Sequence, residues 1–218
     1  MISKKRLLEE SDLYVILDRD LTGGRDILKI ARCVLSAGVS ILQLRDKHSS
    51  TQEMIRTAKA LKALTGRFGA AFIIDDRIDV ALAVKADGIH VGQNDMPYEY
   101  FRKIIPARMI RGLSVETPEQ AAEAEDYKLA YISVSPVFLT ATKSELEHEW
   151  GLEGLRSLAA KTRHTLVAIG GINKSNAGEV LKAGAKGIAV VSAICSAPDP
   201  LTAASELKSI IEKQKIIL

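Results

Sequence analysis

The sequence alternates short apolar runs with longer segments of helical periodicity, and this alternation most limits how the chain can fold. Eight apolar runs have the length of a buried strand, and amphipathic stretches separate them. Strands that alternate with helices pair in parallel, because each helix returns the chain to the edge where the last strand began. We expect strands at residues 13–18, 41–46, 70–75, 88–92, 109–115, 131–138, 165–171 and 187–194.

Signals for the ends of helices lie between these runs. Thr117 followed by Pro118 predicts an N-cap and the first residue of a helix. Gly38, Gly66 and Gly184 each follow an amphipathic stretch and predict helix ends. The segments between the expected strands are therefore helices rather than long loops.

Eight strand–helix units in 218 residues average about 27 residues each, close to the roughly 31 of a 250-residue (β/α)₈ barrel. A doubly wound open sheet is the alternative, and it usually carries a G-x-G-x-x-G motif after its first strand. Residues 18–26 stand at that position and read DRDLTGGRD, which lacks the motif. Because no linker or change of composition divides the chain, we expect one TIM-barrel domain over residues 1–218.

Composition excludes several classes of partner. The net charge is only +3 and aromatic residues make up 5% of the chain, without the clustered basic residues typical of nucleic-acid binding. No apolar stretch is long enough to span a membrane, and residues 1–12 show no signal-peptide core. We expect a cytoplasmic protein with no nucleic-acid or membrane partner. Cys33 and Cys195 fit buried, reduced thiols, and the sequence does not distinguish a monomer from a homo-oligomer.

Polar side chains collect at the end of the strand expected at 41–46. Gln43, Arg45 and Lys47 alternate along the chain, so they lie on one face of that strand. A solvated face would explain this pattern in isolation. If the face points into a barrel, however, its two cations require carboxylate or phosphate partners, because unpaired buried charge is costly.

Two adjacent aspartates, Asp75 and Asp76, end the strand expected at 70–75, where residues 72–79 read FIIDDRID. A strand end followed by a helix cap is one interpretation, and it suits Asp79 well. The other is a Mg²⁺ or phosphate site at the mouth of a barrel, because Mg²⁺ prefers oxygen ligands. Asp95 follows the next strand and would lie near the pair. Both interpretations stay open at this point.

The remaining strand ends carry hydroxyls, glycines and one more cation. In a barrel the active site lies at the C-terminal ends of the strands, and the last two loops often bind phosphate. Acids, cations and hydroxyls at one mouth suit a Mg²⁺-bound pyrophosphate beside a second phosphate, and so two phosphorylated substrates. A polar loop and a tight turn would explain single members of this set, which are Ser114, Thr140, Thr142, Lys143, Gly171, Val191 and Ser192.

These motifs together resemble the thiamine phosphate synthase family. The resemblance runs in order over nearly the whole chain and rests on QLRDK (43–47), DDRIDVALAVKADGIHVGQND (75–95), GLS (112–114), PVFLTATK (136–143), AIGGI (168–172) and VVSAI (190–194). It implies a (β/α)₈ barrel that uses Mg²⁺ and joins a hydroxymethylpyrimidine diphosphate to a thiazole phosphate, releasing pyrophosphate. It also implies that a methylene cation forms on the pyrimidine as the C–O bond breaks, and that the thiazole nitrogen attacks it.

The resemblance assigns a role to each site residue. Asp76 and Asp95 would bind Mg²⁺. No residue would act as a covalent nucleophile, and Arg45, Lys47 and Lys143 would stabilise the charge of the leaving group. The pyrimidine diphosphate would be held by Gln43, Arg45, Lys47, Asp75, Ser114 and Lys143, and the thiazole phosphate by Thr140, Thr142, Gly171, Val191 and Ser192.

Two departures from the family pattern leave other functions open. The family has Asn where this chain has Asp75, and Gly where it has Ser135. One alternative is a thiazole tautomerase, although such relatives use a His where this chain has Glu116. Another is a barrel that binds phosphorylated ligands without catalysis. A phosphosugar isomerase would need an acid–base pair at the strand ends, and His90 fits a hydrogen-bonded strand histidine better than a catalytic base.

Overall fold

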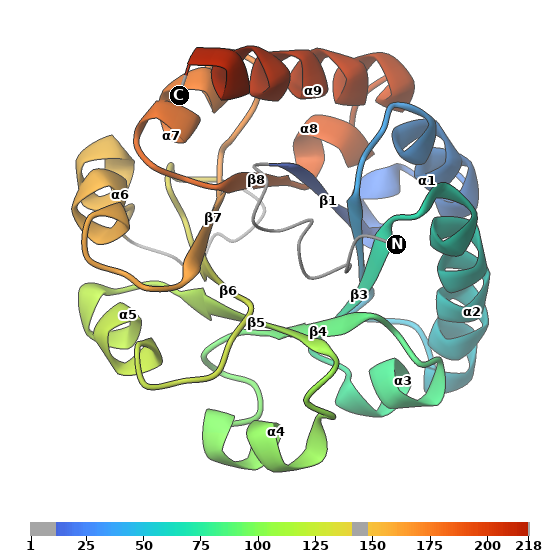
Figure 1. Ribbon diagram of the computed structural model, residues 1–218. Coiled ribbons are helices and arrows are strands. Elements are labelled where there is room, and N and C mark those ends of the chain that lie inside the picture. Colours follow the sequence, from blue (N-terminus) through green and yellow to red (C-terminus); the bar gives the residue numbers. More distant parts are fainter. Residues whose placement is uncertain (1–11, 141–147, 218) are drawn as a thin grey trace.

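The structure is a computed structural model that describes residues 12–140 and 148–217. Eight parallel strands follow one another around a ring, and β8 pairs with β1 to close the barrel. Figure 1 looks along the barrel axis and shows this ring inside a ring of helices. This confirms the predicted (β/α)₈ architecture. The strands are β1 (Asp12–Asp18), β2 (Ile41–Arg45), β3 (Ala71–Asp75), β4 (Gly88–Val91), β5 (Ile110–Val115), β6 (Tyr131–Val134), β7 (Thr165–Ile169) and β8 (Gly187–Val190).

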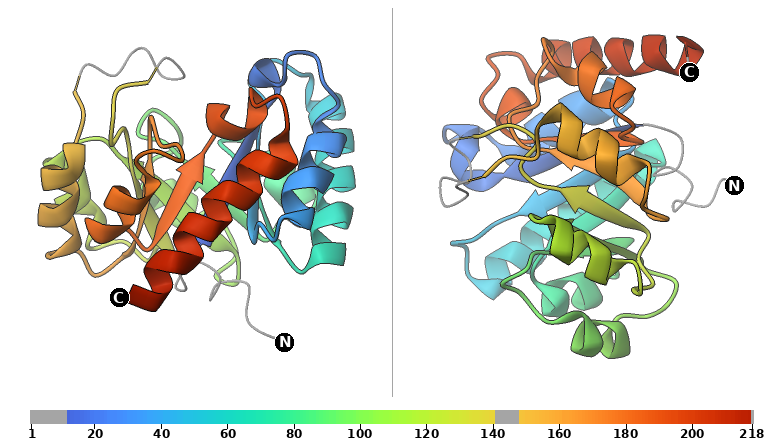
Figure 2. Two further views of the ribbon diagram at one scale, coloured as in Figure 1. Left: turned by 90° about the horizontal axis from the view of Figure 1, so that it is seen from above. Right: turned by 90° about the vertical axis from the view of Figure 1, so that its left-hand side faces the viewer.

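Helices follow the strands and cover the outside of the barrel (Figure 2). No helix in the described part of the chain is long and apolar enough to cross a membrane. The helices are η2 (a 3₁₀ helix, Arg19–Thr22), α1 (Ile27–Ser36), α2 (Thr51–Phe68), α3 (Ile78–Ala83), α4 (Tyr98–Ile104), α5 (Pro118–Ala124), α6 (Gly151–Ala159), α7 (Ala177–Lys182), α8 (Ser192–Cys195) and α9 (Pro200–Ile217).

Two strands are shorter than predicted by four residues each, whereas the others match to within two residues. The strand expected at 131–138 ends at Val134, because Pro136 has no N–H to donate to a neighbouring strand. The strand expected at 187–194 ends at Val190, and the rest of that apolar run turns into α8. Residues 135–137 stay buried after β6 ends, and Ile194 is buried within α8, so the apolar pattern predicted these buried positions although the strands themselves end earlier.

Two helix signals also need correction. Helix α2 continues past Gly66 and ends at Phe68, and the following Gly69 forms the left-handed C-cap with a positive φ of 71°. Asp79 lies in the first turn of α3 rather than at its N-cap, where it is paired with Arg77 at 2.6 Å. The N-cap at Thr117 is confirmed, because its side chain accepts a hydrogen bond from the backbone N–H of Gln120.

The core has two layers that the barrel wall separates. The larger layer lies between the strands and the helices, and the smaller fills the barrel itself. Because side chains fill the interior, ligand can enter only at an end, and the residues beyond the filled layer decide what binds there. The inner layer consists of Tyr14, Ile16, Ile41, Ala71, Ile73, Ile110, Tyr131, Val167 and Ala189.

Candidate active site

A pocket of about 450 Å³ opens at the C-terminal end of the barrel, and all eight strands or the loops after them contribute to its lining. The structure brings together every predicted site residue that it describes. Thr142 and Lys143 lie outside the described residues. Those that line the pocket are Gln43, Arg45, Lys47, Asp75, Asp76, Asp95, Ser114, Thr140, Gly171, Val191 and Ser192.

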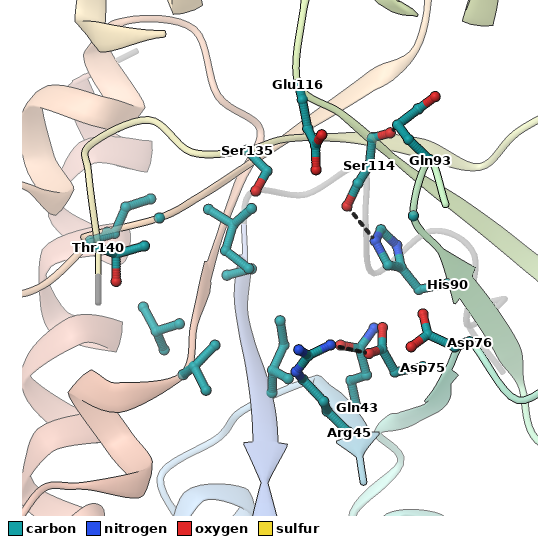
Figure 3. A pocket seen from close by; sticks show the side chains of 18 of the residues that line it. Gln43, Arg45, Asp75, Asp76, His90, Gln93, Ser114, Glu116, Ser135 and Thr140 are labelled. Atoms are coloured by element: carbon teal, nitrogen blue, oxygen red, sulfur yellow. Dashed lines mark hydrogen bonds and ion pairs between the residues drawn. The ribbon is translucent and has the colours of Figure 1, made fainter. Parts of the chain in front are cut away.

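Arg45 lies between two carboxylates. Its Nε donates to Asp18 at 3.1 Å. Its Nη1 donates to Asp75 at 2.9 Å (Figure 3). Burial opposes the charge of Arg45, but the carboxylates of Asp75, Asp18 and Asp76 together outweigh burial and raise the pKa of the guanidinium. A guanidinium carries five N–H groups, more than these two contacts need. The carboxylates therefore fix the orientation of Arg45 without using up its donors.

Asp75 is the acid that stands where the family has an amide. It is buried, and burial followed by the charge of Asp76 raises the pKa of Asp75 to about 7. Arg45 acts in the opposite direction through the ion pair described above. Arg45 is therefore a partner of this extra carboxylate.

Asp76 adopts a left-handed backbone conformation with φ of 58°, which Asp tolerates better than most residues. This turn at the end of β3 lets its N–H donate to the carbonyl of His90 at 2.9 Å and aims its side chain into the pocket (Figure 3). There its Oδ2 is paired with Lys47. The position of Asp76 therefore depends on both backbone and side-chain contacts.

The carboxyl groups of Asp76 and Asp95 are hydrogen-bonded to each other. Burial acts to raise the pKa of both acids, but the hydrogen bond with Asp95 and the ion pair with Lys47 lower the pKa of Asp76. Burial and the bond to Asp76 raise the pKa of Asp95, whose Oδ2 also accepts from the N–H of Gly92 at 2.7 Å. Two acids this close need a proton or a cation between them.

This donor set fits Mg²⁺ bound jointly with a substrate. Residues 12–140 and 148–217 contain no cluster of three or more acids, histidines or cysteines that could enclose a metal ion. Mg²⁺ commonly takes only one or two carboxylates and fills its other positions with water and substrate phosphate. Asp76 and Asp95 supply two such carboxylates beside Lys47 and Arg45.

The opposite side of the pocket has a different chemistry. Gly170 and Gly171 follow β7 with positive φ angles of 104° and 63°, and Val191 and Ser192 lead into α8. A Cβ on Gly171 would lie 2.8 Å from the Cβ of Phe138, so no larger residue fits without a shift. Thr140 lies across the pocket from Asp75 and Asp76 in Figure 3. This side offers backbone groups and small side chains.

Several residues of the site were not predicted. Asp18 does not line the pocket but pairs with Arg45 in the strand register, so its position at the end of the first apolar run could have indicated it. Glu116 and Ser135 line the wall of the pocket, and Ser135 donates its N–H to the carbonyl of Val115 at 3.1 Å. His90 lines the floor, and both of its ring nitrogens have side-chain partners, as expected of a hydrogen-bonded strand histidine.

Comparison with known proteins agrees with this geometry. Residues 13–194 match the family described as thiamine monophosphate synthase. The chain is 44% identical to the thiamine-phosphate synthase of Albidiferax ferrireducens, covering 94% of each chain, and 44% identical to that of Archaeoglobus fulgidus, covering 96% of this chain and 98% of the relative. Among solved structures, thiamine phosphate pyrophosphorylase from Pyrococcus furiosus is similar with a TM-score of 0.88 and 43% identity, covering 95% of this chain and 98% of that one.

Proposed function

Because the chain belongs to the thiamine monophosphate synthase family and is an enzyme of thiamine phosphate synthesis, we propose that its reaction takes place in the pocket at the C-terminal end of the barrel. The enzyme is a transferase that joins 4-amino-5-hydroxymethyl-2-methylpyrimidine diphosphate to thiazole phosphate. A bond from the pyrimidine methylene carbon to the diphosphate oxygen breaks, and a bond from that carbon to the thiazole nitrogen forms. Thiamine phosphate and pyrophosphate are the products.

The pyrimidine diphosphate occupies the side formed by β2 to β5. Arg45, held by its two carboxylates, donates hydrogen bonds to the diphosphate, and Lys47 adds a second positive charge. Asp76 and Asp95 would hold Mg²⁺, which when bound would supply positive charge to stabilise the departing pyrophosphate. Gln43 and Ser114 contact the pyrimidine at the floor. Asp75 acts on this substrate indirectly, because it accepts a hydrogen bond from Arg45 and so orients the guanidinium.

The thiazole phosphate occupies the side formed by the loops after β6, β7 and β8. Backbone groups at Gly171, Val191 and Ser192 surround its phosphate, and Thr140 contributes a hydroxyl. Placing the phosphate there leaves the thiazole nitrogen to face the pyrimidine methylene carbon across the pocket. Thr142 joins this set by resemblance to the family.

The residues of the pocket catalyse by position and charge. As the C–O bond breaks, negative charge grows on the departing pyrophosphate, and Arg45 and Lys47 stabilise that charge in a pre-arranged geometry. Lys143 adds to them by resemblance to the family. The pocket holds the two substrates in contact and excludes water from the electron-poor methylene carbon until the thiazole nitrogen reaches it. No covalent bond to the enzyme is required.

One observation carries this assignment: paired acids beside two cations lie on one side of a pocket whose other side is built from glycines and backbone. The test mixes purified enzyme with both substrates, with and without Mg²⁺, and measures thiamine phosphate and pyrophosphate. We expect equal amounts of both products, and only when both substrates and Mg²⁺ are present. Absence of product with every divalent metal tried would contradict the proposal.

The same assay separates the other functions. A tautomerase would convert thiazole phosphate alone, and Glu116 lines the pocket at the place where such relatives use a histidine. The cytoplasmic location, a possible homo-oligomer and the lack of nucleic-acid or membrane partners stay predictions.

A further inference from the structure

A chain of five hydrogen-bonded side chains crosses the barrel at the floor of the pocket. Gln43 Nε2 donates to Tyr14 Oη at 2.8 Å, and the hydroxyls of Tyr14 and Tyr131 lie 2.9 Å apart. Tyr131 Oη is 3.0 Å from His90 Nδ1, and His90 Nε2 is 2.9 Å from Ser114 Oγ. Every member is at least 92% buried. Its two ends, Gln43 and Ser114, are the residues that the proposed function places against the pyrimidine.

The barrel makes room for this chain at one glycine. In the strand register His90 pairs with Gly112, and Gly112 pairs with Tyr131. A Cβ on Gly112 would lie 2.2 Å from Tyr131 Cζ, so only glycine lets the ring lie across β5 toward His90. The two rings stack with centroids 5.5 Å apart and an interplanar angle of 16°.

Counting protons gives the chain a direction. Gln43 Nε2 can only donate to Tyr14, so the arrangement that gives both tyrosine protons an acceptor within this set of side chains has Tyr14 donating to Tyr131 and Tyr131 donating to His90 Nδ1. Nδ1 is then an acceptor, so neutral His90 carries its proton on Nε2 and donates it to Ser114 Oγ. Burial raises the pKa of Tyr14 well above its ordinary value and also raises that of Tyr131, so both hydroxyls keep their protons.

We propose that Tyr14, Tyr131 and His90 are positioning residues that fix the hydrogen-bonding pattern offered to the pyrimidine. Because Ser114 Oγ accepts from His90, its hydroxyl proton is turned toward the ligand as a donor. Tyr14 holds the amide of Gln43 at the other end of the same floor. An aminopyrimidine presents a ring-nitrogen acceptor next to an amino donor, which matches a fixed hydroxyl donor facing a fixed amide. This inference rests on the proposed function.

The kinetic test compares tyrosine-to-phenylalanine variants. Tyr131→Phe keeps the ring and interrupts the chain of hydrogen bonds in its middle, and Tyr14→Phe interrupts it at a second place. Tyr127→Phe is the matched control on the outside of the barrel, where the Tyr127 hydroxyl is hydrogen-bonded to Glu123. Each interruption removes a buried hydrogen bond, so we expect KM for the pyrimidine diphosphate to rise roughly tenfold. KM for the thiazole phosphate should change little, and the control should change neither.

The proposal is overturned if Tyr14→Phe or Tyr131→Phe folds and keeps the wild-type KM for the pyrimidine diphosphate, or if KM rises equally for both substrates. If Tyr131→Phe does not fold, the result for Tyr14→Phe alone tests the proposal. Failure of the wild-type enzyme to form thiamine phosphate would instead overturn the proposed function.

A measurement without substrate tests the direction of the chain separately. Nitrogen-15 spectra distinguish protonated from bare ring nitrogens, and His90 is identified as the one signal of four histidines that His90→Gln removes. We expect a proton on Nε2 only in the wild-type protein, and a changed Nδ1 signal in Tyr131→Phe. A proton on Nδ1, or an Nδ1 signal that Tyr131→Phe leaves unchanged, would overturn the inferred chain whether or not the enzyme turns over.

Discussion

The two sides of the barrel mouth are organised by different physical means. On the side of β2 to β5, charged side chains hold one another: Asp75, with Asp18 at the end of the adjacent β1, fixes Arg45, and Lys47 is paired with Asp76. On the side of β7 and β8, positive-φ glycines bring the backbone close to the pocket. One side is arranged by ion pairs and the other by the shape of the main chain.

This difference predicts how each side fails. An ion-pair network responds to a change of charge even when the shape of the side chain is kept, because the remaining charges lose their partner. A backbone site does not respond to charge, but a single added methyl group disturbs it. Substitutions that change only charge, or only volume, should therefore separate the two sides.

The largest effect is expected for Asp76→Asn. Asn keeps the size of the side chain and tolerates the left-handed backbone, so the change removes only the charge that faces Lys47 and Asp95. If Asp76 binds Mg²⁺ beside the reacting diphosphate, as we propose, loss of its charge should lower kcat by about 10²-fold or more. Steady-state kinetics at several Mg²⁺ concentrations measures this.

Asp79→Asn is the matched control, because Asp79 is an exposed acid of the same strand–helix turn and pairs only locally with Arg77. It should keep close to the wild-type kcat. A near-wild-type rate for Asp76→Asn would mean that the charged side is not the site of metal-assisted chemistry.

Gly171→Ala should act on the other side alone. Its φ of 63° and the 2.8 Å approach to the Cβ of Phe138 mean that an added Cβ must move the loop. We expect KM for the thiazole phosphate to rise about tenfold, with a much smaller change for the pyrimidine diphosphate, since about 1.4 kcal/mol corresponds to tenfold in affinity.

For comparison, Gly178→Ala adds the same methyl group within α7, where the nearest atom is 3.6 Å away. Alanine is favoured over glycine in a helix by about 1 kcal/mol, so this control should keep its activity and gain a little stability. Equal changes in both KM values of Gly171→Ala would show that the two sides are not independent.

Asp75→Asn tests whether the extra acid helps or hinders the charged side. At pH 8, above its pKa of about 7, Asp75 carries a charge that repels the diphosphate and also orients Arg45. Asn can still accept a hydrogen bond from Arg45, so we expect the repulsion to dominate and the affinity for the diphosphate to rise about threefold to tenfold. Calorimetric titration with pyrophosphate and Mg²⁺ measures it. A lower affinity would show that the charge of Asp75 is needed to hold Arg45.

The sequence predicted the barrel because strand and helix periodicities are local properties, and each expected strand has a counterpart in the structure. It overestimated β6 and β8 for one shared reason. Val137 and Ile194 are fully buried although both lie beyond the ends of the strands. The apolar run in the sequence therefore extends further than the paired strand does. Apolar runs report contact with the core, which loops and short helices also make.

The charged side was predicted from residue type and position at strand ends, and the structure brings those residues to one pocket. Tyr14 and Tyr131 were not predicted. They lie 117 positions apart, and their contact depends on barrel closure and on the space left by Gly112. A tyrosine within an apolar run predicts only a buried core residue. The three-dimensional structure is needed to show that its hydroxyl has a partner across the barrel.

The smallest effect is expected from Asp46→Asn, which removes a support of the charged side without touching the pocket. Asp46 follows β2, is buried, and accepts from Arg19 at 2.7 Å and from the N–H of Ser49 at 3.0 Å. Burial opposes its charge, but the bonds from Ser49 and Arg19 lower the pKa of Asp46. An acid whose pKa is lowered by folding stabilises the protein above its unfolded pKa of about 3.9 and loses that contribution as the pH falls through its folded pKa.

The Asp46→Asn variant should therefore be less stable than wild type by about 1–2 kcal/mol at pH 7, with the difference shrinking below about pH 4. Urea unfolding at pH 7 and near pH 3 measures both values, and a difference that persists at the lower pH would show that Asp46 acts by shape rather than by charge.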